Sequence, residues 1–229
     1  MFEIIALILG IVWFIIIYNM QKKSKKLSLK YCIIAMLAGA IPVMLLTLIA
    51  QIGLGFGLRL LPDGYLKETL DAFIVAALVE ESLKMIAGII ICKKVKPERH
   101  IDCVLIFACV GLGFMMTEHI MGTSGIVSTI VQTLAPGHLS FQIIMGDLYY
   151  RNKKGAALIV PVIIHGIWDT MCLVGPLLIA SMASDAEILL GAALLLLLLP
   201  FCIGITIFTL VKYGKIAKAE DKLVTETSC

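Results

Sequence analysis

The chain has 229 residues, of which 60% are hydrophobic and 15% are charged, and its mean hydropathy is +1.03. A soluble core cannot bury so much apolar surface, so the composition excludes an ordinary soluble protein and predicts an integral membrane protein in contact with membrane lipids. The net charge of +3 comes from basic clusters between apolar runs, as topology signals do, which argues against nucleic acid as a partner.

Seven apolar segments follow one another along the chain. They cover residues of about 2–20, 31–51, 71–92, 103–121, 126–150, 156–180 and 188–211. We therefore predict an all-α fold, a polytopic membrane protein with a bundle of about seven transmembrane helices. The connections are short, which predicts a single membrane domain over residues 1–229. Residues 52–70 are expected to form an outer connection, and the polar residues 212–229 an unstructured tail.

The distribution of basic residues predicts the orientation. Apart from Arg59, Lys67 and Lys84, every Lys and Arg follows the first, third, fifth or seventh apolar segment. The positive-inside rule then places the N-terminus outside and the C-terminal tail in the cytoplasm. The first segment is predicted to be a retained helix, because it has neither a basic leader nor a small-residue cleavage site.

The third apolar segment carries two adjacent carboxylates, Glu80 and Glu81, with Lys84 one helical turn later. Ionisable groups are costly to bury in a membrane, so such residues are interpreted first as a functional site. On a helix, Lys84 lies between the two carboxylates in angle, so that one ammonium can face both. A structural ion pair that holds the bundle together is the alternative.

Further polar side chains occur in the next three apolar segments. Glu118 and His119 stand near the end of the fourth, His138 follows a Pro-Gly pair in the fifth, and His165 and Asp169 lie one turn apart in the sixth. Depth can be counted inward from the outer face at about 1.5 Å per residue. Glu118 lies at a shallow depth, whereas a depth of roughly 14–22 Å is shared by Glu80, Glu81, His138, His165 and Asp169. We therefore expect them to converge in one layer.

This set of residue types suits the hydrolysis of an amide bond in a protected cavity. The reaction needs a base to activate water, a proton donor for the leaving nitrogen and donors for the oxyanion. A glutamate beside a second carboxylate suits the first role, histidines suit the second, and an imidazole or a protonated acid suits the third.

Three motifs and one further histidine occur in order on four successive segments. They are Glu80-Glu81-Ser-Leu-Lys84 (EExxK), Phe114-Met-Met-Thr-Glu118 (FxxxE), His138, and His165-Gly-Ile-Trp-Asp169 (HxxxD). The ordered set resembles the PrsW family of intramembrane proteases, relatives of the CAAX-protease and bacteriocin-processing (CPBP) group. The resemblance covers roughly residues 71–175, the predicted catalytic core. His119 departs from it, because an asparagine is expected there.

The resemblance implies an intramembrane endopeptidase of the bacterial plasma membrane. Its substrate would be a single-pass, membrane-anchored protein, in bacterial members an anti-sigma factor that receives its first cut. Glu80 or Glu81 would be the water-activating base and Glu118 a supporting carboxylate. The residues that stabilise the oxyanion or protonate the leaving group would be His138, His165 and Asp169. Lys84 and His119 would support them.

The sequence leaves the metal question open. Families of this kind are described both as metal-dependent and as glutamate-dependent. The chain has no HExxH motif, and the spacing of its candidate ligands does not demand a metal. We favour a site with no cofactor, and the alternative is zinc held by Glu118, His138 and His165.

Other interpretations stay open at this point. His138 can bond to a carbonyl freed at the helix break, His165 and Asp169 can be a packing pair, and Glu118 with His119 can be a solvated interfacial pair. The chief rival function is a proton-coupled transporter or carrier, in which intramembrane Glu, Lys, His and Asp residues form an ion pathway. A seven-span receptor or scaffold is a third possibility, which would not need the paired glutamates.

Overall fold

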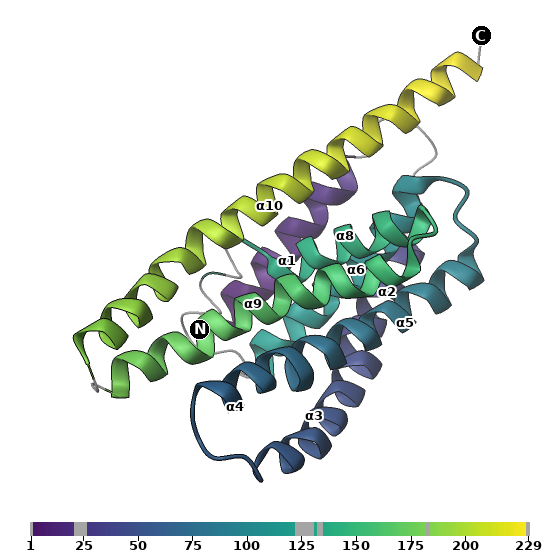
Figure 1. The fold of residues 1–229 in the computed structure, drawn as a ribbon. Helices are drawn as coiled ribbons and strands as arrows, with labels where there is room; N and C mark the ends of the chain where they lie inside the picture. Colours follow the sequence, from purple (N-terminus) through teal and green to yellow (C-terminus); the bar gives the residue numbers. More distant parts are fainter. Residues whose placement is uncertain (1, 21–26, 122–130, 132–134, 182–183, 228–229) are drawn as a thin grey trace.

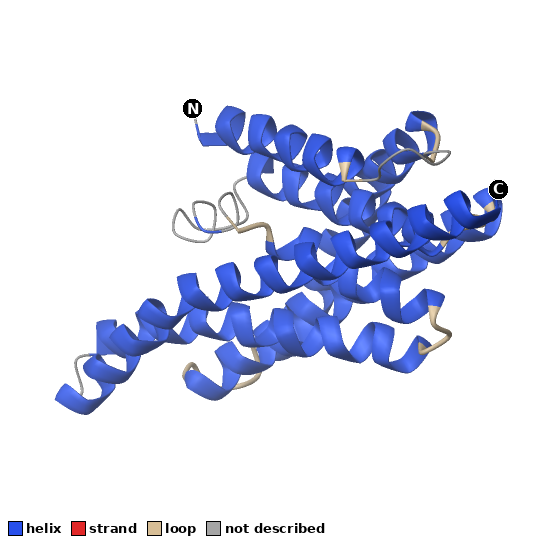
Figure 2. Ribbon diagram, turned by 90° about the horizontal axis from the view of Figure 1, so that it is seen from above, coloured by secondary structure: helices blue, strands red, loops and turns tan. Residues whose placement is uncertain are grey.

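The computed structural model describes residues 2–20, 27–121, 131, 135–181 and 184–227 (Figure 1). Every regular element in these ranges is helical, and they contain no strand (Figure 2). The predicted all-α class is therefore confirmed. An apolar chain in a membrane forms helices because each helix satisfies its own backbone hydrogen bonds where water is absent.

The helices follow the predicted apolar segments. They are α1 (Phe2–Asn19), a continuous run of α2 (Leu29–Ala38), η1 (Gly39–Val43) and α3 (Met44–Leu58), the short α4 (Tyr65–Leu70), a second run of η2 (Asp71–Leu78) and α5 (Val79–Val95), then α6 (His100–Met121), α8 (Gly137–Tyr150), α9 (Lys154–Ser181) and α10 (Asp185–Thr227).

Four of these helical stretches are long and apolar enough to cross a membrane. They are Leu29–Leu58, His100–Met121, Lys154–Ser181 and Asp185–Lys222, and Leu7–Asn19 is a shorter apolar helix. Helices thus form where the sequence predicts them, whereas a bundle of seven membrane-crossing helices stays a prediction.

Two predicted boundaries are wrong. The expected outer connection, 52–70, is helical at both ends, and only residues 59–64 between α3 and α4 are non-helical. The expected unstructured tail continues α10 as a helix to Thr227. Tertiary contacts override its polar composition, because Tyr213 and Ala217 are buried in the main core and Glu220 accepts a hydrogen bond from the backbone N–H of His100 at 3.1 Å.

Some predictions fall outside the described residues. These are the basic cluster at Lys22, Lys23, Lys25 and Lys26, the connection at 122–125, and most of the first part of the fifth apolar segment, 126–134. Within the described ranges that segment is a helix only from Gly137, apart from the single helical residue Val131.

Helix α6 is the centre of the bundle, and α1, α2, α5 and α8 pack around it. Its sequence is apolar on every side, as is typical of a buried helix. Two glycines let neighbouring backbones approach closely. A Cβ atom at Gly111 would lie 2.6 Å from both Cγ of Gln142 and the carbonyl oxygen of His138, and one at Gly113 would clash with the backbone of Met36. Gly111 therefore sets how near α8 comes to α6.

Wide π-helical turns occur in two places. One is η1, which contains Pro42, and the other is η2, which ends at Leu78, two residues before Glu80. Such turns are rare in proteins and frequently accompany functional sites. Here η2 leads straight into the two carboxylates.

Candidate active site

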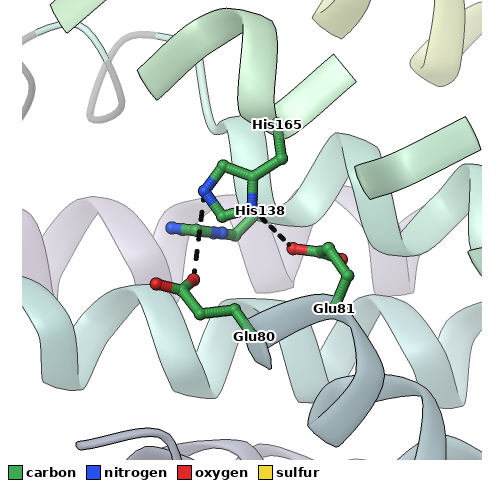
Figure 3. Close-up of side chains that lie close together, drawn as sticks. All are labelled: Glu80, Glu81, His138 and His165. Carbon is green, nitrogen blue, oxygen red and sulfur yellow. Dashed lines mark hydrogen bonds and ion pairs between the residues drawn. The ribbon is translucent and has the colours of Figure 1, made fainter. Parts of the chain in front are cut away.

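Four ionisable side chains from three helices meet inside the bundle. Glu80 and Glu81 come from α5, His138 from α8 and His165 from α9, and each offers one ligand atom within 4.8 Å of the others (Figure 3). All four are at most 6% exposed. The predicted convergence of these residues is therefore observed.

Lys84 supplies the cation at the centre of this group. Its Nζ donates to Glu80 Oε2 at 3.0 Å and to Glu81 Oε1 at 2.8 Å, and lies 2.9 Å from Nδ1 of His138. It also lies 4.0 Å from the ring centroid of Phe114, a cation–π contact. The side chain is fully buried, so the ammonium balances the two carboxylates in place of water.

His138 joins Lys84 to Glu118. Since an ammonium can only donate, the contact with Lys84 makes Nδ1 of His138 the acceptor. The neutral ring then carries its proton on Nε2, which donates to Glu118 Oε2 at 2.9 Å. Glu118 therefore lies behind His138, as an orienting partner, and outside the group of four.

His165 lies between carboxylates on two helices. Its Nδ1 is 3.0 Å from Glu81 Oε1, and its Nε2 is 3.2 Å from Asp169 Oδ2 and 3.9 Å from Glu80 Oε2. The predicted pairing of His165 with Asp169 through one helical turn is present. Both ring nitrogens face carboxylate oxygens, an arrangement that suits a proton donor.

Aromatic rings enclose the two histidines. Phe141 stacks on His165 with ring centroids 5.2 Å apart, and Phe114 meets His138 edge-on at 5.2 Å. The predicted supporting residue His119 is 3% exposed and lies beside Glu118 on α6, but it contributes no ligand atom to the group of four. His138 and His165 are 2% and 3% exposed, so that water has little access to their imidazoles.

Two glutamines that are not part of the sequence motifs also belong to the site. Gln142 Nε2 donates to Glu81 Oε2 at 2.7 Å, and Gln51 Nε2 donates to Glu80 Oε1 at 3.1 Å. A usable signal was present for Gln142, because it lies one helical turn after His138 and thus on the same face of α8. Gln51 is an uncharged residue in an apolar helix, and its partner could not be found from spacing.

The donor types of this group fit a metal ion such as zinc. Two carboxylates and two imidazoles form an N/O ligand set, which zinc accepts. Tetrahedral zinc with bonds of about 2.0–2.2 Å needs its ligand atoms about 3.5 Å apart, so the group must contract. Lys84 Nζ now contacts three of the four residues, and it would have to move aside. The residues fit if these side chains rearrange.

Comparison with known proteins identifies the family. Residues 27–205, well over half of the chain, match the profile of the PrsW family intramembrane metalloproteases. The chain belongs to the PrsW family. It is therefore an intramembrane protease and an integral membrane protein, and the match includes every predicted site residue. No curated protein and no solved structure matches the chain.

Family membership bears on two predictions. It favours a protease over the rival carrier, and its description as a metalloprotease family favours zinc or another metal over the metal-free site. The candidate ligand group in the structure differs from the alternative set that the sequence suggested for a metal. The ligand atoms that converge belong to Glu80 and Glu81 together with His138 and His165, whereas Glu118 was predicted in place of the glutamate pair.

Proposed function

We propose that this PrsW-family chain hydrolyses a peptide bond of a single-pass, membrane-anchored protein, with an anti-sigma factor as the candidate substrate in a bacterium. The observation that carries the proposal is the buried group of Glu80, Glu81, His138 and His165 in an apolar helical bundle. Its residue types include a base, a proton donor and donors for an oxyanion, which peptide hydrolysis needs.

We assign the water-activating role to Glu80. Both oxygens of Glu81 are engaged, Oε1 by Lys84 and His165 and Oε2 by Gln142, and its side chain is fully buried. Glu80 accepts fewer hydrogen bonds among the described residues, and its side chain is 8% exposed. Glu80 is thus better placed to meet a water molecule, while Glu81 positions Lys84 and His165.

His165 is the candidate proton donor for the leaving nitrogen, because Glu81 and Asp169 hold both of its ring nitrogens. His138 is the candidate donor to the oxyanion, through the Nε2–H that donates to Glu118 in this structure and would turn to the oxyanion when substrate is bound. In a metal-bound form, Glu80, Glu81, His138 and His165 would instead hold the ion, which would activate water and polarise the scissile carbonyl.

The proposed topology has seven membrane spans in one domain, 1–229, with the catalytic core at about 71–175. The N-terminus would lie outside and the C-terminus in the cytoplasm of a bacterial plasma membrane. The one-sided distribution of Lys and Arg supports this orientation. Helices at each predicted span support the number of spans, with α8 described from Gly137.

Cleavage of a single-pass substrate by the purified protein in proteoliposomes tests the function. We expect Glu80→Gln, Glu81→Gln and His165→Ala each to abolish cleavage. The matched control is Glu98→Gln, because Glu98 is an exposed carboxylate in the loop before α6. Undiminished cleavage by all three site variants contradicts the proposal. Solute flux that requires Lys84, without proteolysis, favours a carrier.

A further inference from the structure

A pocket lies at the far end of the helices that form the site. Its volume is about 470 Å³, in the range of ligand pockets. One side is formed by the end of α5 and the following loop, with Lys93 and Lys96, and the other by the connection from α8 to α9, with Asn152 and Lys154. Both connections lie at the same end of the bundle, on the right of Figure 1.

The pocket is separate from the candidate active site. Lys93 follows Glu81 by twelve residues of continuous helix, which is about 18 Å along the axis of α5. None of its lining residues belongs to the group of four, to their glutamine partners or to Glu118. A ligand here would not compete with a substrate at the glutamates.

The pocket carries an uncompensated positive charge. Lys93, Lys96 and Lys154 line it and are exposed, no carboxylate lines it, and within the described ranges the three lysines form no ion pair. The two arginines nearby behave differently. Arg99 donates to Asp102 at 2.9 Å, and Arg151 donates to Asp147 at 2.8 Å. The arginines are therefore neutralised, and the pocket lysines remain available to an anion.

The backbone around the pocket is unusual. Lys96 and Asn152, with φ of 51° and 58°, are the two non-glycine residues with positive φ in the described part of the chain, and both line the pocket. Asparagine tolerates this conformation, whereas lysine adopts it rarely. Such residues concentrate at functional sites, where the surrounding structure holds them in place.

Its polar groups define the ligand. Three ammonium groups, the side-chain amide of Asn152 and the hydroxyls of Tyr149 and Tyr150 are all hydrogen-bond donors on the pocket wall. Several donors with a net positive charge suit a phosphate group, and basic pockets between membrane helices bind anionic lipid headgroups. We propose that this pocket binds a phosphate-bearing anion, of which an anionic phospholipid headgroup is the membrane source.

Binding here would connect the three helices of the active site. The pocket is lined by the last turns of α5 and α8 and by the first residue of α9, and these helices carry the glutamates, His138 and His165 respectively. An anion held by Lys96 and Lys154 therefore links α5 to α9. The ligand adds a contact between the last turn of α5 and the first turn of α9.

The test compares two triple variants of the full chain that lose the same charge. The pocket variant is Lys93→Gln/Lys96→Gln/Lys154→Gln. The control is Lys94→Gln/Lys153→Gln/Lys218→Gln, which removes exposed lysines that do not line the pocket. Native mass spectrometry in detergent measures bound phosphatidylglycerol against phosphatidylcholine. We expect wild type and control to retain phosphatidylglycerol selectively and the pocket variant to bind it at least about tenfold more weakly.

A second arm separates the two sources of the anion. Inorganic phosphate and glycerol 3-phosphate are added to lipid-free protein, and the thermal unfolding midpoint is measured. A rise that the pocket variant loses, without selective lipid retention, identifies a free phosphate ester as the ligand. Lipid retention without such a rise identifies the headgroup. Equal behaviour of the two triple variants towards every probe, or no binding by wild type, overturns the proposal.

Discussion

Nε2 of Gln142 donates a hydrogen bond to Oε2 of Glu81 at 2.7 Å, and both side chains are completely buried. The contact joins α8 to α5 and fixes the one oxygen of Glu81 that neither Lys84 nor His165 contacts. Gln142 thereby orients a carboxylate that in turn positions Lys84 and the proton donor His165. It is a positioning residue, not a catalytic one.

Replacement of Gln142 by leucine should reduce cleavage about 10- to 100-fold, the usual effect of losing an outer partner of a catalytic or ligating group. Glu81 would then lose a donor in an environment without water. The rate of substrate cleavage measures the effect, with Met145→Leu as a control for repacking elsewhere on α8. A cleavage rate equal to that of the control would mean that Gln142 does not position Glu81.

Gly111→Ala should destabilise the protein by about 1–3 kcal/mol, because its Cβ would meet Gln142 and the backbone of His138 at 2.6 Å. Cleavage should fall too, since α8 must move away from the site. The free energy of unfolding in denaturant and the cleavage rate are the measurements. Gly53→Ala is the matched control, since a Cβ there meets nothing within 4 Å. Equal effects of the two changes would contradict the close packing.

Lys84→Met should cost about 3–5 kcal/mol of stability in metal-free protein, because it leaves two buried carboxylates without their cation. Lys67→Met is the control, since Lys67 pairs with Asp63, whose side chain is 94% exposed. The free energy of unfolding in denaturant is measured for both variants. A variant as stable as the control would show that Lys84 does not balance the charge of the glutamates.

Zinc content distinguishes a ligand from a residue that orients one. We expect His138→Ala and Glu81→Gln to lose bound zinc, measured by elemental analysis of purified protein. Glu118→Gln should still bind it, about 10- to 100-fold more weakly, because Glu118 acts through His138. A loss on Glu118→Gln as complete as that on His138→Ala would restore Glu118 to the ligand set. A chelator should also stop cleavage, and added zinc should restore it.

The sequence predicted the helices well, because each long apolar run has only one way to satisfy its backbone in a membrane. It also predicted the convergence of Glu80, Glu81, His138 and His165, since residue depth follows from counting along a helix. The tail was predicted wrongly. Its polar composition suggested disorder, whereas Tyr213 anchors it in the core.

The partners within the site were harder to predict. The position of Glu118 behind His138, and the contact of Gln51 with Glu80, depend on how α3, α6 and α8 are rotated about their axes. No spacing within one helix reports that rotation. The close approach at Gly111 fixes it for α8, and such a contact is visible only in three dimensions.

Helix α10 has a consequence for the membrane itself. Its apolar part, residues 188–211, is about 36 Å long, whereas the hydrocarbon core of a bilayer is about 30 Å thick. A helix that is too long is accommodated by tilting. Ser140 and Thr209 connect α10 to α8 through a buried hydroxyl contact of 3.1 Å. We expect a thinner bilayer to increase the tilt of α10 and to pull on α8, the helix of His138, so that the rate of proteolysis should depend on lipid chain length.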